Sequence, residues 1–297
     1  MISFIVNYLL PFLVLSFVII GSIYFYIDSR IISSKAKNGH TQGGSAFRNN
    51  RCYFGAKGNK VKKNVFPYRD IPCNGDIFRA FWIIYNYDLG SRDENFFGAL
   101  ILKWIHDGNV KLEKDTNNII FVNKPINCSE IEKKMFHYMC QASRYGGNSN
   151  DNSSITLERS EFIKWCESNT DKILYWFSDV LDLEIKKMVK EGKIIPIKVK
   201  QSRSYTLAYK VDDSMMEEAE KLAGLKKFLE EFSVIKNREP IEIELFNQYL
   251  IFAQLFGIAD KVDKRFHELY PDFIQTVIIK DTDINFADSF NISFVDF

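Results

Sequence analysis

The first 27 residues constrain this chain more than any other segment, because no charged side chain occurs before Asp28. About 20 consecutive apolar residues are enough for a helix to cross the hydrocarbon core of a bilayer. Tyr24 and Tyr26 lie at the end of the segment, where aromatic side chains favour the lipid headgroup layer. We therefore predict one transmembrane helix within residues 2–27.

Two alternatives to a permanent anchor are a cleaved signal peptide and a buried helix of a soluble protein. A signal peptide has a basic start, a core of about 7–15 apolar residues and a small-residue cleavage site. Here Met1-Ile2-Ser3 contains no basic residue, the apolar run is longer, and no A-x-A motif follows it. The sequence thus favours the anchor.

A basic segment follows the apolar run and predicts its orientation. Between Asp28 and Asp70 the chain has ten Lys and Arg residues against these two aspartates, a net +8 that leaves −7 for the rest of the +1 chain. Lys and Arg close to a spanning helix stay on the cytoplasmic side. We therefore expect an N-terminus outside the cell and a cytoplasmic body. The basic segment either attracts anionic lipid headgroups or is simply a solvated linker.

Helical periodicity, alternation and polar breaks predict the organisation of the rest of the chain. Two helical segments followed by a hairpin occur twice, on either side of the polar stretch Tyr145–Ser154. This is the order of a winged-helix module, so we predict a mainly α chain with small β-hairpins (α+β) and two such units. The predicted division is a transmembrane helix 1–27, a basic flexible juxtamembrane linker 28–66, a first winged-helix-like unit 67–144, a polar loop 145–154, a second winged-helix-like unit 155–235, C-terminal helices 236–271 and a tail 272–297.

Local signals place the elements of the first unit. Ordered structure should begin near Tyr68. A capping box at Ser91 and Glu94 should start a helix that ends at Gly108. The alternating segment after it predicts a hairpin that turns at Asp115–Asn118.

The second half of the chain has two further signals. Alternation on either side of Gln201–Ser204 predicts the second hairpin. After Pro240 the chain should form one long helix towards Pro271, and its part Ile241–Asp260 is apolar around most of its circumference. A helix of this kind is usually buried, so we expect it in the core of the C-terminal region.

No catalytic motif is present. The sequence lacks G-x-S-x-G, H-E-x-x-H, a phosphate-binding G-x-x-x-x-G-K-[ST] and a dinucleotide-binding G-x-G-x-x-G after a strand. Its five cysteines are odd in number and include no C-x-x-C pair, which predicts neither a disulfide framework nor a zinc ribbon. We therefore expect no enzyme activity, no cofactor, and no catalytic, cofactor-binding or metal-binding residues.

Three weaker candidates are interpreted as structural. Cys73 precedes a predicted helix, where a thiol can be activated, but a buried cysteine is favoured. His137 and Cys140 share a helix face and could supply half a metal site, although core side chains are favoured. The acidic pairs are interpreted as solvated helix faces: Glu217-Glu218 and Glu230-Glu231.

Nucleic-acid binding is the alternative function, because winged helices often place a helix in the major groove of DNA. The second predicted hairpin is basic, with Lys198, Lys200, Arg203 and Lys210. The helix before it is mixed in charge, and the net −7 of the body opposes phosphate binding. We therefore expect the lipid bilayer, through residues 2–27, and an unidentified protein to be the partners. The expected role is protein interaction or scaffolding, and the alternative is a membrane-tethered nucleic-acid-binding regulator.

Three segments of the body resemble a known family. They are Ile71–Asp76 (I-P-C-N-G-D) with the helix after it, Gly98–Lys114 and Asn237–Val262. In this order, over about Tyr68–Pro271, they resemble the bacterial predicted membrane proteins of domain of unknown function 2207. The resemblance implies no established activity. Members of the family look longer, with an extracytoplasmic β-rich domain before the anchor, so the resemblance covers an anchor and a cytoplasmic half.

Overall fold

The computed structural model describes residues 52–90, 93–113, 118–126, 128–145, 156–201, 204–231 and 245–269, together with Ile284. The predicted transmembrane helix and the first part of the predicted linker lie outside the described residues, as do the loop 146–155 and the side chains of the predicted capping box. Among the residues that are described, no helix combines the length and the apolar character needed to cross a membrane.

The described residues are mainly helical with two small three-stranded sheets, which confirms the predicted α+β class. They form two compact units, one with residues 196–211 and the strand that precedes Gly58, the other with residues 59–195 and those from Asp212 onward. The elements are β1 (Cys52–Phe54), the 3₁₀ turn η2 (Pro72–Gly75), α3 (Ile77–Asn86), α4 (Asp93–His106), β2 (Val110–Leu112), β3 (Ile119–Phe121), α5 (Glu130–Tyr145), β4 (Thr156–Leu157), α6 (Arg159–Ser168), α7 (Thr170–Lys190), β5 (Ile194–Gln201), β6 (Ser204–Val211), α8 (Ser214–Glu230), α10 (Phe246–Phe256) and α11 (Ala259–Leu269).

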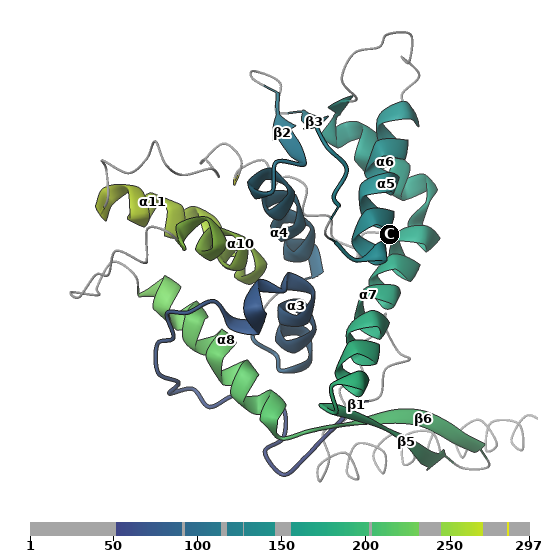
Figure 1. Ribbon diagram of the computed structural model, residues 1–297, viewed down its shortest axis with the longest axis vertical. Coiled ribbons are helices and arrows are strands. Elements are labelled where there is room, and N and C mark those ends of the chain that lie inside the picture. The colour runs from purple at the N-terminus through teal and green to yellow at the C-terminus, as the bar shows by residue number, and fades with distance from the viewer. Residues whose placement is uncertain are drawn as a thin grey trace, which may run out of the picture. The chain divides into compact units, whose positions relative to one another are not determined.

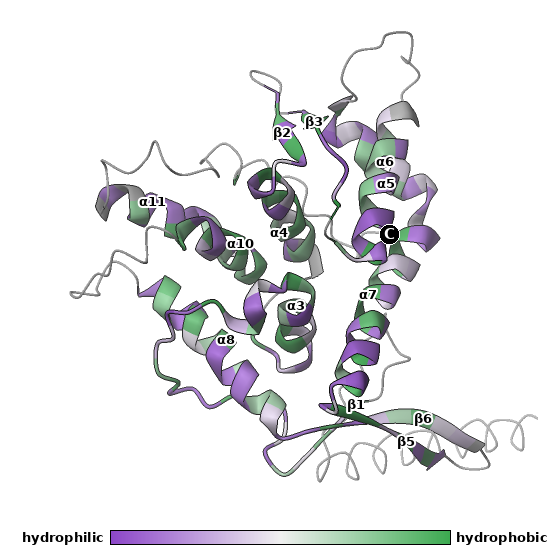
Figure 2. Ribbon diagram, viewed as in Figure 1, coloured by the Kyte–Doolittle hydropathy of each residue, from purple (hydrophilic) through white to green (hydrophobic). Residues whose placement is uncertain are grey.

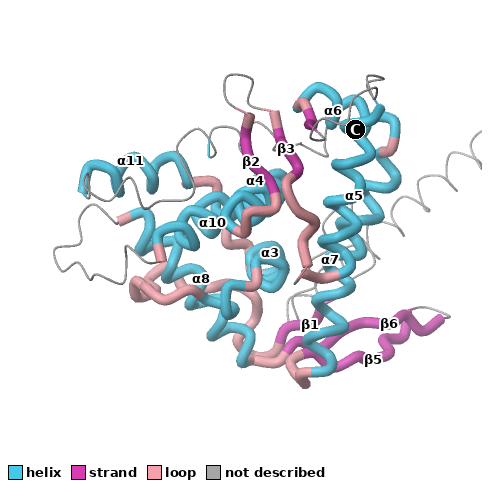
Figure 3. The backbone as a smooth tube through the Cα atoms, turned by 45° about the horizontal axis from the view of Figure 1, so that its top comes forward, coloured by secondary structure: helices cyan, strands magenta, loops and turns pink. Residues whose placement is uncertain are grey.

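α3 is the central helix of the larger unit, where it contacts α4, α7, α8 and α10 (Figures 1 and 3). Asp76 starts it, because its side chain accepts hydrogen bonds from the backbone N–H groups of Phe78 and Arg79. Nearly all its side chains are buried, and Figure 2 shows that α3 and α10 are mainly hydrophobic. Burial of each large apolar side chain stabilises the fold by about 1.5–3 kcal/mol, so α3 contributes strongly to the core.

An aromatic cluster joins α3, α4 and α7. Phe81 stacks on Phe96 with ring centroids 4.4 Å apart, and Phe97 stacks on Trp176 at 5.6 Å. The buried indole N–H of Trp176 donates to the backbone oxygen of Ile131 at 2.7 Å. The cluster thus combines apolar packing with a satisfied polar group, as buried tryptophans require.

Both predicted hairpins are present. β2 and β3 pair antiparallel on either side of the turn predicted at Asp115–Asn118, and β4 extends the sheet in the order β2-β3-β4. β5 and β6 are hydrogen-bonded neighbours on either side of the turn predicted at Gln201–Ser204. The helix before the first hairpin ends as predicted, because Gly108 adopts φ 72° just after α4.

Ordered structure does not begin near Tyr68, and this prediction is wrong. Residues Cys52–Phe54 form β1, which pairs parallel with β6 and places Cys52 opposite Tyr209. Cys52 and Phe54 are both buried. The residues around this triplet are basic and include glycine, so the sequence indicated a flexible linker. The strand is short, and its partner β6 lies far along the chain.

The prediction of one long late helix is also wrong. α10 ends at Gly257, which adopts φ 72°, and α11 begins two residues later. The N–H groups of Gly257 and Ile258 donate to Gln254 O and Ala253 O, each at 2.9 Å, which is the glycine-terminated end of many helices. The predicted burial is confirmed, because Ile251, Phe252 and Leu255 are all buried.

A glycine within α8 permits close approach of the chain segment around Phe66. A Cβ atom at Gly224 would lie 2.6 Å from the backbone oxygen of Phe66 and 2.9 Å from Cβ of Tyr68. Gly→Ala in an unhindered helix interior stabilises it by roughly 1 kcal/mol. We expect Gly224→Ala instead to lower the thermal melting temperature, while Glu220→Ala on the same helix leaves it nearly unchanged. A higher melting temperature for Gly224→Ala would contradict this close contact.

A polar cleft beside the start of α3 is the candidate binding site

The cleft begins at a strained turn in the I-P-C-N-G-D segment. Cys73 and Asn74 adopt φ 55° and 52°, and Gly75 follows at φ 77°. The left-handed region is uncommon for residues other than glycine, and such strain concentrates at functional sites. A backbone hydrogen bond of 3.0 Å from Asp76 N–H to Cys73 O closes the turn.

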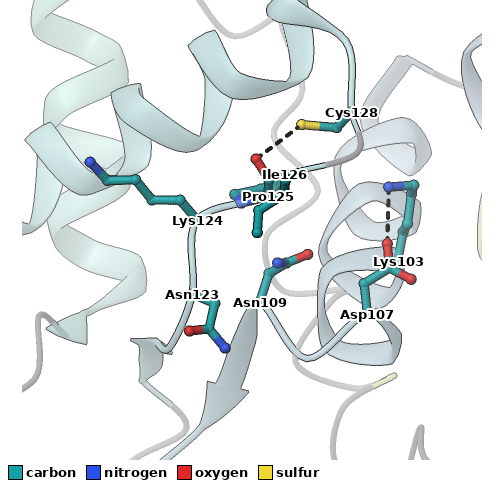
Figure 4. A pocket seen from close by; sticks show the side chains of 8 residues that line it. All are labelled: Lys103, Asp107, Asn109, Asn123, Lys124, Pro125, Ile126 and Cys128. Carbon is teal, nitrogen blue, oxygen red and sulfur yellow. Dashed lines mark hydrogen bonds and ion pairs between the residues drawn. The ribbon is translucent and has the colours of Figure 1, made fainter.

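Two pockets meet beside this turn and share Lys103 and Cys128 as lining residues. The smaller, of about 240 Å³, is lined by the turn, by the first residues of α3 and α5, and by Lys187 of α7. The larger, of about 740 Å³, is lined by the end of α4 and the connection from β3 to α5. Figure 4 shows its side chains, with Lys124 extending away from Lys103. The residues of the larger pocket are Lys103, Asp107, Asn109, Asn123, Lys124, Pro125, Ile126 and Cys128.

Lys103 and Glu132 form a partly buried ion pair at the junction of the two pockets. Glu132 is buried, and its Oε1 accepts from Lys103 Nζ at 2.8 Å and from Trp104 Nε1 at 2.9 Å. Burial alone would lower the pKa of Lys103, but the hydrogen bond to Glu132 and the charge of Asp107 raise it. The pKa of Asp107 is lowered by its hydrogen bond with His106 and by Lys103. Lys103 therefore stays protonated and Asp107 stays ionised at neutral pH.

A second ion-pair network joins the start of α3 to α7. Glu184 is fully buried and accepts from Arg79 Nε at 3.0 Å and from Lys187 Nζ. The other end of the Arg79 guanidinium contacts both carboxylate oxygens of Glu191, at 2.8 and 3.0 Å. Lys187 also reaches Asp76, the cap of α3, at 3.5 Å. The network thus fixes the strained turn and the wall of the smaller pocket.

Asn109, just before β2, and residues of the connection from β3 to α5 line the larger pocket with polar and apolar side chains. The backbone oxygen of Asn109 accepts from the N–H groups of Val122 and Asn123, at 2.9 and 3.1 Å, which fixes the start of the connection. The side-chain amides of Asn109 and Asn123 make no hydrogen bond to another described residue. Beside them, the Ile126 side chain is 83% exposed. This surface can hydrogen-bond a ligand and cover an apolar group.

The thiols near the cleft are not activated. Burial, together with the charge of Glu218, raises the pKa of the Cys73 thiol to about 12. Burial and Glu132 also raise the pKa of Cys128, whose Sγ donates to Pro125 O at 3.5 Å. Both thiols are therefore protonated at neutral pH, and Cys73, which the sequence favoured as a buried cysteine, is half-buried.

The structure does not assemble the other sequence candidates into a site. His137 is exposed and contacts Gln141, and Cys140 is half-buried on the same helix. No group of three His, Cys, Asp or Glu side chains within the described ranges is arranged to hold a metal ion. Of the acidic pairs, Glu217, Glu230 and Glu231 are exposed and Glu218 contacts Lys221 at 2.8 Å.

Most residues of the cleft were not predicted from the sequence. A signal existed for Glu184, which follows Phe177, Val180 and Leu181 at the spacing of the buried face of α7. A signal also existed for Lys103, because this charged residue interrupts the apolar run of α4. For Asn109 and Asn123 there was no such signal, because they are brought together only by the pairing of β2 with β3.

Comparison with protein families identifies part of the chain. Residues 202–266 match the model of the predicted membrane protein (DUF2207) C-terminal domain. The resemblance found in the sequence is thereby confirmed for these residues, which include α8 and α10, whereas Ile71–Asp76 and Gly98–Lys114 lie outside the match. Neither the curated proteins nor the solved structures include a match to the chain.

Proposed function

We propose that this is a single-pass membrane protein whose cytoplasmic body binds another protein and has no catalytic activity of its own. The uncharged segment 2–27 and the family match support the anchor. The net +8 of the segment that follows supports an N-terminus outside the cell. In this role the body is an interaction or scaffolding module held at the membrane.

The observation that carries the proposal is the surface formed by Asn109, Asn123 and Ile126. A side-chain amide can donate to and accept from a peptide group at the same time. The two amides lie in one pocket with an exposed isoleucine at its edge, a combination that suits an extended peptide segment with an apolar side chain. We therefore propose such a segment of a partner protein as the ligand of the larger pocket.

Ion pairing in the cleft favours binding over catalysis. The pKa of Lys103 is raised and that of Asp107 is lowered, and these two groups form an ion pair, while the Cys128 thiol has a raised pKa. A nucleophile or general base needs a pKa near the operating pH. These groups instead supply a rigid, polar wall.

Site-specific photo-crosslinking in native membranes tests the protein partner. Benzoylphenylalanine at Ile126 is expected to give a discrete cross-linked protein species, which Asn109→Ala with Asn123→Ala weakens. Tyr175 on α7 is a matched control, because its side chain is also exposed, at 69%. The alanine variants keep the backbone bonds of Asn109, so the fold should persist. No cross-link at position 126, or the same species from position 175, would overturn the proposed site.

Cysteine labelling of intact cells tests the topology separately. An impermeant thiol reagent is expected to label an introduced Ser3→Cys and not an introduced His40→Cys, because only the first lies outside in the proposed orientation. Labelling of position 40 alone would overturn that orientation.

A further inference from the structure

The β5–β6 hairpin carries an exposed aromatic and aliphatic surface. Tyr205 and Leu207 on β6 are 68% and 52% exposed, and with Lys198 of β5 they line one shallow pocket. Figure 1 shows the two strands side by side. Exposed Tyr and Leu beside a lysine are the side chains that favour the boundary between lipid headgroups and acyl chains.

The charge of this hairpin is entirely positive. Lys198, Lys200 and Lys210 are exposed and form no ion pair with another described residue. From Ile194 to Val211 the sequence contains no aspartate or glutamate. In a body of net negative charge, this is a local surface that complements an anionic partner.

The pairing of β6 with β1 connects the hairpin to the proposed anchor through a short chain segment. β6 pairs with β1, and β1 begins at Cys52, so the 24 residues 28–51 connect it to the predicted span. A segment of this length that behaves as the flexible linker predicted from the sequence has an r.m.s. end-to-end distance of about 25–30 Å. The hairpin would then be held close to the lipid headgroups.

We propose that the β5–β6 hairpin docks on an anionic lipid surface, with Tyr205 and Leu207 at the headgroup layer and the three lysines on lipid phosphates and carboxylates. The proposal extends the proposed membrane attachment. Each basic residue near such a surface contributes about 1 kcal/mol, which is roughly fivefold in the docking equilibrium.

Charge pairing at the C-terminal end of α7 and just after it favours lipid over nucleic acid as the anionic partner. Lys187 pairs with Glu184 and Asp76, and Lys193 pairs with Glu191. A winged-helix protein that reads DNA inserts a helix into the major groove, where free basic and polar side chains contact the bases. The lysines of the hairpin, by contrast, have no internal partner among the described residues.

Lipid photo-crosslinking of the full chain in nanodiscs tests this docking. Benzoylphenylalanine at Tyr205 is expected to label phosphatidylserine-rich nanodiscs strongly and pure phosphatidylcholine nanodiscs weakly. Lys198→Gln, Lys200→Gln and Lys210→Gln together should remove most of the preference, by about fivefold for each lysine. Benzoylphenylalanine at Tyr175 replaces one exposed tyrosine by the same probe and is expected to give little lipid labelling.

Each outcome decides the proposal independently of the proposed partner protein. Labelling at position 205 that does not depend on phosphatidylserine, or that equals labelling at 175, overturns it. A salt-dependent shift of duplex DNA that the three glutamine substitutions abolish would also overturn the proposal, if lipid labelling at position 205 is absent. If the chain fails to insert into nanodiscs but is still labelled by lipid at position 205, the docking is supported. The proposed transmembrane anchor is then overturned instead.

Discussion

Phe252→Asp is expected to destabilise the body by several kcal/mol. Phe252 lies on α10 and is only 1% exposed, and α10 packs against α3, α4, α8 and α11. The substitution removes a buried ring, which alone costs about 3–5 kcal/mol, and places an unpaired carboxylate in an apolar environment. A loss of this size is a large part of the stability of a typical domain. Thermal and denaturant unfolding of the purified protein would measure it.

Leu250→Asp should have a similar effect, although position 250 lies on a different side of the same helix. Leu250 is fully buried, and two residues of helix separate the side chains by about 200°. Phe252→Leu keeps the site apolar and should cost less, and Tyr175→Asp at an exposed position should cost little. An unchanged unfolding midpoint for either buried variant would mean that its side of α10 is exposed in solution.

The burial of α10 was predictable, and its end was not placed correctly. Apolar residues around most of the circumference indicated a buried helix. Gly257 lies within the segment predicted to form one long helix, yet it ends α10 in the left-handed conformation. A glycine within an apolar run is compatible with both a close helix contact and a helix end, and the sequence alone did not distinguish them.

The strand pairings, too, could be predicted from the sequence only in part. The two hairpins followed from local alternation, because their partners are close in the sequence. The pairing of β1 with β6 joins residues 157 positions apart, and β4 pairs with β3 although α5 lies between them in the sequence. Short strands of two or three residues carry little periodicity, so their positions depend on tertiary contacts that the sequence does not display.

The candidate site was predictable only where it coincided with a motif. In the I-P-C-N-G-D segment the sequence suggested a role only for the Cys73 thiol, whereas the structure shows a left-handed backbone at Cys73 and Asn74 and a helix cap formed by Asp76. Ion pairs such as Lys103 with Glu132 join different helices. Charge composition alone does not show which of many Lys and Glu residues will meet.

Arg79→Met is expected to destabilise the protein by about 3–5 kcal/mol, because it leaves the fully buried Glu184 carboxylate without one of its two partners. Burial would lower the pKa of Arg79, but its hydrogen bonds to Glu191 and Glu184 raise it, so the guanidinium is always charged in the native state. Arg79→Met together with Glu184→Leu removes both charges. The double variant should therefore be more stable than Arg79→Met alone, although it also lacks the native Glu184 carboxylate.

The pH dependence of unfolding provides a second measurement of the same network. The hydrogen bond and charge of Arg79 lower the pKa of Glu191 from its ordinary value of 4.5. A lowered native pKa contributes stability that is present above that ordinary value and is lost as the pH falls below it. Wild type should lose this contribution on acidification, whereas Arg79→Met and the matched control Glu191→Gln should show a weaker dependence in this range. At neutral pH Glu191→Gln should cost much less than Arg79→Met, because Glu191 is partly exposed and Glu184 keeps both partners. Equal stability of Arg79→Met and wild type at neutral pH would contradict the buried pairing of Arg79 with Glu184.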